Sequence, residues 1–223
     1  MDRDELIAFL RRCGVAEARL ADLSPMERLR RDLIEANRST NLTGITGDDD
    51  FWLLHLADSL AVGTAAPELM TEALVVADVG CGAGFPMLPL AWANGLLAVT
   101  EIDGRGRKIE FVRRQIESMG LTKCRPLAGR ARELAGPPEH AGAYDAVLLR
   151  ATGTPGKLLR ERHHLPRPGG RIIFYTTPAD ADEQRDLSRR EAGKFGLDLA
   201  ESPTIALPGQ AGQRRFVIFT RRA

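Results

Sequence analysis

The chain has 223 residues, of which 43% are apolar, and its formal net charge is +1. This length and apolar content support one sizeable hydrophobic core. The chain has no run of about 18 apolar residues, so no membrane span is predicted, and the acids before the first apolar stretch argue against a secretory signal. The three cysteines are odd in number and lack metal-ligand spacing, which indicates a reduced, cytoplasmic protein without a metal site.

The charges are divided unevenly along the chain. Residues 1–73 carry 8 basic and 14 acidic side chains, a balance of −6, whereas residues 74–223 carry 23 basic and 16 acidic ones, a balance of +7. The stretch 105–132 alone holds nine basic and two acidic residues. Such asymmetry favours a polyanionic partner for the second part, with an ordinary solvated helix face as the open alternative.

The first 73 residues are predicted to form a helical extension. A short helix is expected over 3–12. The segment Ser24-Pro25-Met26-Glu27 is typical of a helix start, with Ser24 as the cap. Polar turn formers interrupt the helical period over 37–43, and three aspartates from residue 48 begin another helix, where they suit its positive N-terminal end.

From residue 74 onward, apolar runs alternate with helical segments. Strands separated by helices imply a mostly parallel sheet that is covered on both faces. We therefore predict an α/β domain over 74–223 behind the helical extension 1–73. Strands are expected at 74–79, 96–102, 123–127, 144–149, 171–175, 203–207 and 215–220, and helices over 105–119 and 180–195.

A glycine-rich loop follows the first predicted strand, where residues 78–86 read Asp-Val-Gly-Cys-Gly-Ala-Gly-Phe-Pro. Gly80, Gly82 and Gly84 allow the backbone to approach a ligand without Cβ clashes. Their spacing differs from the dinucleotide fingerprint G-x-G-x-x-G, and no phosphate-binding lysine follows, so a P-loop is excluded.

An acidic side chain lies at the end of the second predicted strand. Asp103, nineteen residues after Gly84, can accept hydrogen bonds from two ribose hydroxyls. Glu101, two residues earlier on the same side of the strand, is an open alternative. The loop and the spaced acid together resemble the class I S-adenosylmethionine-dependent methyltransferases. The resemblance implies a Rossmann-like, mostly parallel seven-stranded sheet and S-adenosylmethionine as the cofactor.

The residues near the fourth strand narrow the choice of methyl acceptor. Leu148-Leu149-Arg150-Ala151 stands where methylation of an exocyclic amine needs a polar-Pro-Pro-aromatic loop. Neither Cys81 nor Cys124 lies where methylation of a pyrimidine carbon needs a nucleophile. The N7 atom of guanine has a lone pair that reacts without a base, so alignment suffices. Arg150 can donate to the N7 and O6 acceptors of that base.

Several further motifs follow one another in a fixed order along the chain. They are Asn41-Leu42-Thr43, His55-Leu56-Ala57-Asp58-Ser59-Leu60, the glycine loop, Asp145, Arg150-Ala151 and Arg214-Arg215-Phe216. As an ordered set they resemble a narrower family, the bacterial 16S ribosomal RNA guanine-N7 methyltransferases, also called glucose-inhibited division protein B. The resemblance implies methylation of a guanine N7 in 16S ribosomal RNA, or in the small ribosomal subunit. The implied cofactor contacts are Gly80, Phe85, Ala131, Arg132 and Arg150.

The chain departs from that family pattern at several positions. Arg132 stands where the family has Glu, Met87 where it has Gly, and Leu54 where it has a basic residue. Thr176-Thr177-Pro178 replaces a Lys-Gly pair after the fifth strand. Because this lysine is missing, the chain as a divergent member of the family with another methyl acceptor is an open alternative.

Single polar residues have both a structural and a functional interpretation. For His55 and for Asp58, a structural role in packing or capping and a role in shaping the active site are equally good interpretations. Arg150 is the charged residue that ends an apolar strand. Burying its charge costs free energy unless the guanidinium is paired or binds a ligand. We expect Arg150 and His55 to be catalytic, in a protein that acts as a monomer. A small-molecule methyltransferase and a non-catalytic RNA-binding module remain alternatives.

The predicted helix that begins at residue 105 supplies a candidate surface for RNA. Its apolar side must face the sheet, which leaves Arg107, Arg113 and Arg114 pointing outward. These side chains are expected to contact phosphates and so to position the RNA without reading its sequence.

Overall fold

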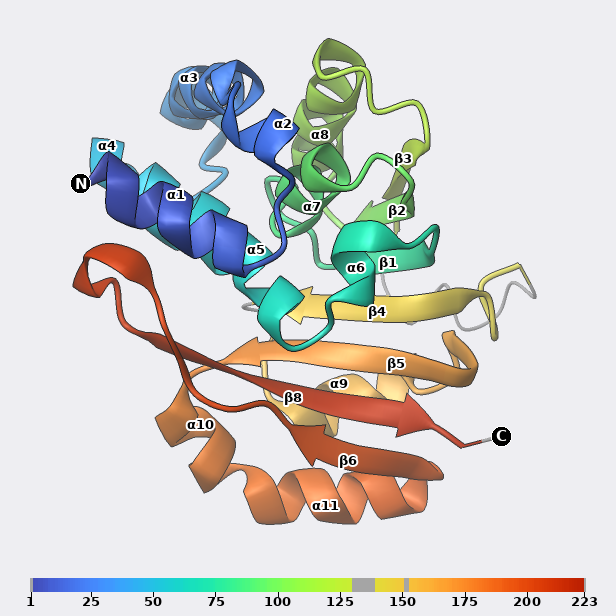
Figure 1. The fold of residues 1–223 in the computed structure, drawn as a ribbon. Helices are drawn as coiled ribbons and strands as arrows, with labels where there is room; N and C mark the ends of the chain where they lie inside the picture. The colour runs from blue at the N-terminus through green and yellow to red at the C-terminus, as the bar shows by residue number, and fades with distance from the viewer. Residues whose placement is uncertain (1, 130–138, 151–152, 223) are drawn as a thin grey trace.

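The computed structural model describes residues 2–129, 139–150 and 153–222 (Figure 1). Within them, strands lie side by side in the order β3-β2-β1-β4-β5-β8-β6, and the two-residue β7 also pairs with β8. Neighbours from β3 to β5 are parallel, whereas β8 is antiparallel to both β5 and β6. The predicted mostly parallel sheet is confirmed, with seven strands in one path and β7 as an eighth that pairs with β8. The strands are β1 (Val75–Val79), β2 (Ala98–Asp103), β3 (Cys124–Ala128), β4 (Tyr144–Arg150), β5 (Pro166–Thr176), β6 (Leu197–Glu201), β7 (Ile205–Ala206) and β8 (Gln213–Arg221).

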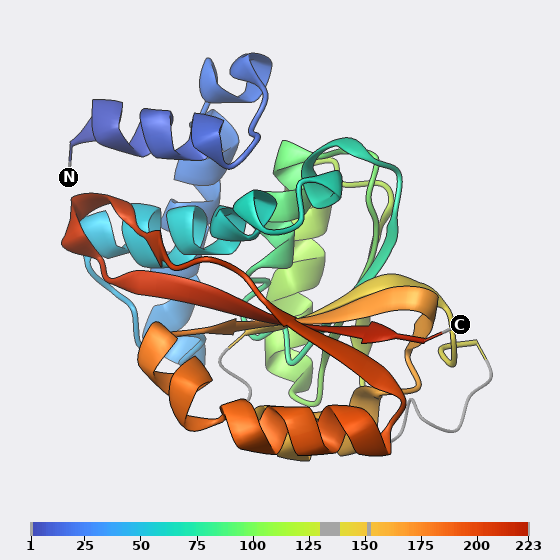
Figure 2. The same ribbon diagram turned by 60° about the horizontal axis from the view of Figure 1, so that its bottom comes forward.

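Helices cover both faces of this sheet (Figure 2). None of the described helices is long and apolar enough to cross a membrane. The α-helices are α1 (Arg3–Arg12), α2 (Glu17–Leu20), α3 (Ser24–Thr40), α4 (Asp48–Asp50), α5 (Asp58–Leu60), α6 (Glu68–Thr71), α7 (Met87–Ala93), α8 (Gly106–Ser118), α9 (Pro155–Arg162), α10 (Pro178–Glu183) and α11 (Arg185–Lys194). Between α4 and α5 runs the π-helix η1 (Phe51–Ala57), followed after α5 by the 3₁₀ turn η2 (Ala61–Thr64), and η4 (Pro208–Gln210) precedes β8.

Alternation along the strands separates two hydrophobic clusters. Val76 of β1 belongs to the cluster under α7, α8 and the N-terminal helices, whereas Ala77 belongs to the one under α9 and α11. Because side chains alternate between faces, Asp78 shares the face of Val76. The polar side chains at the ends of β1 and β2 therefore face the N-terminal helices.

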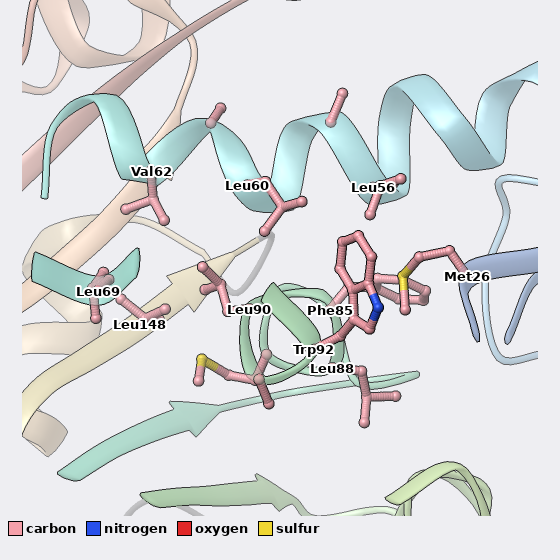
Figure 3. Packing of buried hydrophobic residues seen from close by; sticks show 14 of the residues in the cluster. Met26, Leu56, Leu60, Val62, Leu69, Phe85, Leu88, Leu90, Trp92 and Leu148 are labelled. Carbon is pink, nitrogen blue, oxygen red and sulfur yellow. The ribbon is translucent and has the colours of Figure 1, made fainter. Parts of the chain in front are cut away.

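The N-terminal helices pack directly on this first face. Figure 3 shows Leu56, Leu60 and Val62 turned toward α7, where Leu90 and Trp92 meet them. Leu6 of α1 and Ile173 of β5 belong to the same buried cluster. The extension thus shares its core with the sheet. The boundary at residue 73 remains a prediction.

The structure corrects several expected elements. Ser24 does not cap α3 but is its first residue, and the Asp22 carboxylate accepts a hydrogen bond from the Ser24 amide at 2.9 Å. The helix expected over 180–195 is divided into α10 and α11 at Gln184, whose ψ of 5° is not helical. The strand expected at 203–207 is only the two-residue β7, which pairs with the start of β8. The longer partner of β8 is β6, which lies earlier in the chain and begins after Gly196, a residue with φ of +66°. Helix α9 was not predicted.

Candidate functional site

The glycine loop crosses the carboxyl end of β1 and is fastened to β2. The amides of Gly80 and Cys81 both donate to the Ile102 carbonyl, at 2.8 and 3.0 Å. Gly82 has φ of +59°, and a Cβ there would find nothing closer than the Lys108 ammonium at 3.8 Å. At Gly84, with φ of +86°, a Cβ would come within 2.3 Å of the Leu88 side chain. Gly84 therefore serves helix packing, whereas Gly82 leaves open space at the strand ends.

Asp103, the last residue of β2, is held by main-chain amides. Its Oδ2 accepts from the Gly82 amide at 3.1 Å, and its Oδ1 accepts from the Arg105 amide at 2.9 Å. Only 5% of the residue is exposed. A carboxylate has about four lone-pair sites, so Asp103 can accept further hydrogen bonds, as a ribose diol requires.

Glu101 and Asp78 form a buried acidic pair beneath the loop. They are register partners on adjacent strands, with exposed fractions of 0% and 1%. No described residue gives either carboxylate a hydrogen bond of ordinary geometry, although the Cys81 thiol lies beside Glu101. Burial raises the pKa of Glu101 to about 8. Burial, together with the neighbouring Glu101 charge, raises the pKa of Asp78 well above its usual range. The pair was not predicted, because strand register is not visible in sequence.

These residues fit S-adenosylmethionine. That cofactor carries a ribose diol, and the loop offers a fixed carboxylate at Asp103 and a Cβ-free approach at Gly82. The predicted cofactor residues Gly80, Gly82 and Asp103 meet at this one place, with Gly84 and Phe85 next along the loop. The predicted contacts Ala131 and Arg132 lie outside the described residues.

A second cluster of polar residues lies at the carboxyl end of β4. Asp58 bridges two arginines: its Oδ2 lies 3.1 Å from the Arg150 Nε, and its Oδ1 accepts from the Arg214 Nε. The remaining Arg150 nitrogens donate to the Ser59 hydroxyl at 3.0 Å and to the Leu54 carbonyl at 2.8 Å. The Arg150 charge is therefore paired, and every nitrogen of its guanidinium contacts the N-terminal helices. Its expected catalytic role stays a prediction.

Sequence reasoning did not anticipate how this cluster is assembled. Asp58 and Arg214 are 156 positions apart. The Tyr175 hydroxyl adds a bond of 2.9 Å to the Ser59 carbonyl. Asp58 and Arg214 each belong to a motif of the resemblance, but neither motif carries information about this pairing.

His55 lies between the two clusters. Its ring stacks on Phe85 with centroids 4.1 Å apart, and its Nε2 lies 3.3 Å from the Thr43 hydroxyl. Burial, and secondarily the Arg150 charge, lowers the pKa of His55 to about 3. The structure therefore brings His55, Phe85 and Arg150 together and keeps the imidazole neutral.

A pocket of about 490 Å³ opens beside Arg150 and Asp58. Thr176 and Thr177 stand at its wall, where the resembled family has Lys-Gly. Among the described residues, no group of three or more His, Cys, Asp or Glu side chains is arranged to hold a metal ion. The further lining residues include Ile45, Leu54, Gly153, Tyr175, Gln184 and Arg214.

The predicted basic surface on α8 is exposed. Arg113 and Arg114 are 50% and 68% exposed, and both lie near Glu110, at 3.6 and 3.5 Å. Lys108 turns inward instead, and its Nζ donates to the Leu42 carbonyl at 2.8 Å. This bond ties the N-terminal extension to the helix that follows Asp103.

Comparisons with known proteins agree with this geometry. Residues 22–198 match the family model GidB, described as rRNA small subunit methyltransferase G. Two proteins named Ribosomal RNA small subunit methyltransferase G are similar to this chain. The one from Deinococcus deserti is 37% identical over 186 residues, which is 83% of this chain and 75% of that protein. The one from Myxococcus xanthus is 35% identical over 222 residues, which is 98% of this chain and 96% of that protein.

A solved SAM-dependent methyltransferase from Aquifex aeolicus has the same fold, with a TM-score of 0.57 at 14% identity over 81% of this chain and 96% of that one. The expected class I fold, methyltransferase activity and S-adenosylmethionine cofactor are therefore confirmed. The chain belongs to the GidB family, that of rRNA small subunit methyltransferase G.

Proposed function

We propose that this protein transfers the methyl group of S-adenosylmethionine to N7 of a guanine in 16S ribosomal RNA. The observation behind the proposal is the position of His55, whose ring stacks on Phe85 between the glycine loop and a pocket lined by Arg150 and Arg214. An imidazole with a pKa of about 3 is a poor general base. Guanine N7 needs no base, because its lone pair attacks directly.

The cofactor side would be held by residues of the loop and of β2. Gly80 and Gly82 would allow close approach, Phe85 would pack against the bound molecule, and Asp103 would accept from the ribose hydroxyls. When bound, S-adenosylmethionine supplies an electrophilic methyl group on a sulfonium. The protein's part is then to align acceptor and donor and to exclude water.

On the acceptor side, Arg150 would mainly position the pocket wall, since its three nitrogens already have partners. Arg214 is more open, with 21% of its side chain exposed against 13% for Arg150. If an arginine donates to the N7 and O6 edge, Arg214 can do so with less rearrangement. The target base has to be unstacked before it enters the pocket.

The experiment compares three classes of acceptor with methyl-labelled S-adenosylmethionine: naked 16S RNA, intact small subunits and a metabolite extract. All three come from cells that lack the protein. We expect label in RNA or subunits. Label confined to small molecules would establish the small-molecule alternative, and cofactor binding without any transfer would favour the non-catalytic RNA-binding module.

We also propose action in the cytoplasm, as a monomer and without a metal ion. Sedimentation of the protein and activity in the presence of a chelator test the last two points. A dimer at micromolar concentration, or loss of activity that a divalent ion restores, would contradict them.

A further inference from the structure

A groove of about 620 Å³ runs between α1, α3 and η1, in the N-terminal extension. Its apolar lining residues include Leu6 and Ile34, together with the half-buried Trp52. Exposed arginines stand along the sides, among them Arg31 and Arg38, whose side chains are 71% and 72% exposed.

The charge of this groove is opposite to that of its surroundings. Residues 1–73 have a balance of −6, yet four of their eight basic residues line the groove: Arg3, Arg30, Arg31 and Arg38. Its acidic lining residues are Glu27 and Glu35. Glu35 pairs with Arg38 at 2.7 Å, but an exposed pair of this kind is weak, so a phosphate can replace it. The groove thus combines a cationic rim with an aromatic ring, which suits a polyanion that carries bases.

The groove also leads toward the acceptor pocket. A hollow of about 230 Å³ next to it shares Ile34 and Arg38 with the groove and Ile45 with the pocket beside Arg150. Arg30, Arg31 and Arg38 of α3 lie along this path. The stretch of α3 that lines the groove, from Glu27 to Arg38, is eleven residues or roughly 16 Å long. One track therefore connects Trp52 with the pocket proposed for the target base.

We propose that this track binds the single-stranded RNA that flanks the target base, with Arg31 and Arg38 on phosphates and Trp52 stacked on a base. The inference rests on the proposed function, because the RNA strand is the one whose guanine enters the pocket. Arginine–phosphate pairing and base stacking recognise single strands without regard to sequence. The groove then anchors the strand while the pocket selects the base.

The experiment measures binding of a fluorescent single-stranded RNA oligomer as a function of salt. The double variant Arg31→Glu/Arg38→Glu should weaken binding at least about 10-fold and flatten the salt slope by about 1.4, since each lost phosphate contact removes about 0.7. Trp52→Leu should weaken binding by about 5-fold or more, whereas Trp52→Phe keeps a stacking ring and most of the affinity. Calorimetry should give the parent's affinity for S-adenosylmethionine in every variant.

The matched control is Arg189→Glu/Arg190→Glu on α11, which changes net charge equally on the other side of the sheet and should bind RNA like the parent. Parental RNA affinity and salt slope in Arg31→Glu/Arg38→Glu would overturn the proposal, and so would an equal loss in the α11 control. If the parent binds RNA through the groove but methylates none, the proposed function fails while the groove assignment stands.

Discussion

The cofactor edge and the acceptor edge of this sheet are built in different ways. At the cofactor edge, main-chain groups position the site, because the amides of Gly82 and Arg105 donate hydrogen bonds to the Asp103 carboxylate. At the acceptor edge, charged side chains from distant segments hold one another, with Asp58 between Arg150 and Arg214. A site made from backbone depends on local conformation, whereas a site made from side-chain charges depends on the complete fold.

This difference has an energetic consequence. A buried ion pair adds little net stability, but removing one partner leaves an uncompensated charge and is costly. Substituting a glycine in the left-handed region has a different effect, because the added side chain strains the loop but leaves no unpaired charge. Substitutions at the two edges should therefore separate cofactor binding from stability and from acceptor chemistry.

The largest effect is expected at the loop. Gly82→Val places a branched side chain at φ of +59°, on the open side where the cofactor would lie. Binding of S-adenosylmethionine should fall below detection by calorimetry, while the circular dichroism spectrum stays as in the parent. Gly193→Val is the control, since Gly193 lies in α11 with nothing within 4 Å. Normal cofactor binding by Gly82→Val would make the loop an ordinary turn.

Breaking the acceptor edge should act on stability and transfer together. Asp58→Asn leaves the Arg150 and Arg214 charges without their shared carboxylate, so the free energy of unfolding should fall by about 3–5 kcal/mol. The folded variant should still bind S-adenosylmethionine within about threefold of the parent but lose methyl transfer.

Asp198→Asn serves as the control for Asp58→Asn, because Asp198 and Arg222 form an exposed pair whose loss should cost at most about 1 kcal/mol. An Asp58→Asn protein that is as stable and active as Asp198→Asn would show that the bridge is incidental.

At the cofactor edge, the two acids should separate. Asp103→Ala should weaken S-adenosylmethionine binding by about 1–3 kcal/mol, the scale of an unpaired buried partner. Glu101→Gln should change that affinity little, because Glu101 is fully buried beneath the loop. The reverse order of effects in calorimetry would move the ribose contact to Glu101.

Glu101 should instead control stability against pH. Its pKa is about 8 in the folded protein and near 4.5 when exposed, so the folded state holds a proton that the unfolded state releases. This contribution is complete below pH 4.5 and is lost as pH rises toward 8. Glu101→Gln should therefore gain about 1–3 kcal/mol over the parent near pH 8 and little near pH 4.5. Denaturant titrations showing the same difference at both pH values would contradict this.

The smallest effect concerns His55. Because its pKa is lowered to about 3, it stays neutral across the working range. The rate of methyl transfer at saturating cofactor should be nearly flat between pH ~6.5 and ~8.5. His55→Gln should keep that flat profile. A rise with an apparent pKa near 6.5 that disappears in His55→Gln would mean that the imidazole acts as a base.

The same contrast decides what could be predicted from the sequence. The strands of the cofactor half and the glycine loop follow from local patterns, and the structure contains them. Asp103 ends β2 as expected, whereas its contact with the ribose stays a prediction. The position of β6 was missed because Gly196 and the alternation after it are weaker signals than the apolar residues near β7. The Asp58 bridge and the Asp78–Glu101 register need tertiary structure, which no spacing along the chain encodes.

The most direct test of the account is the identity of the methylated nucleoside. Small subunits or 16S RNA from cells without this protein are incubated with methyl-labelled S-adenosylmethionine and the purified enzyme, and the RNA is digested to nucleosides for mass spectrometry. We predict that the label elutes as 7-methylguanosine and is absent with Gly82→Val. Label in any other nucleoside, or on a base whose methylation requires a general base, would contradict it.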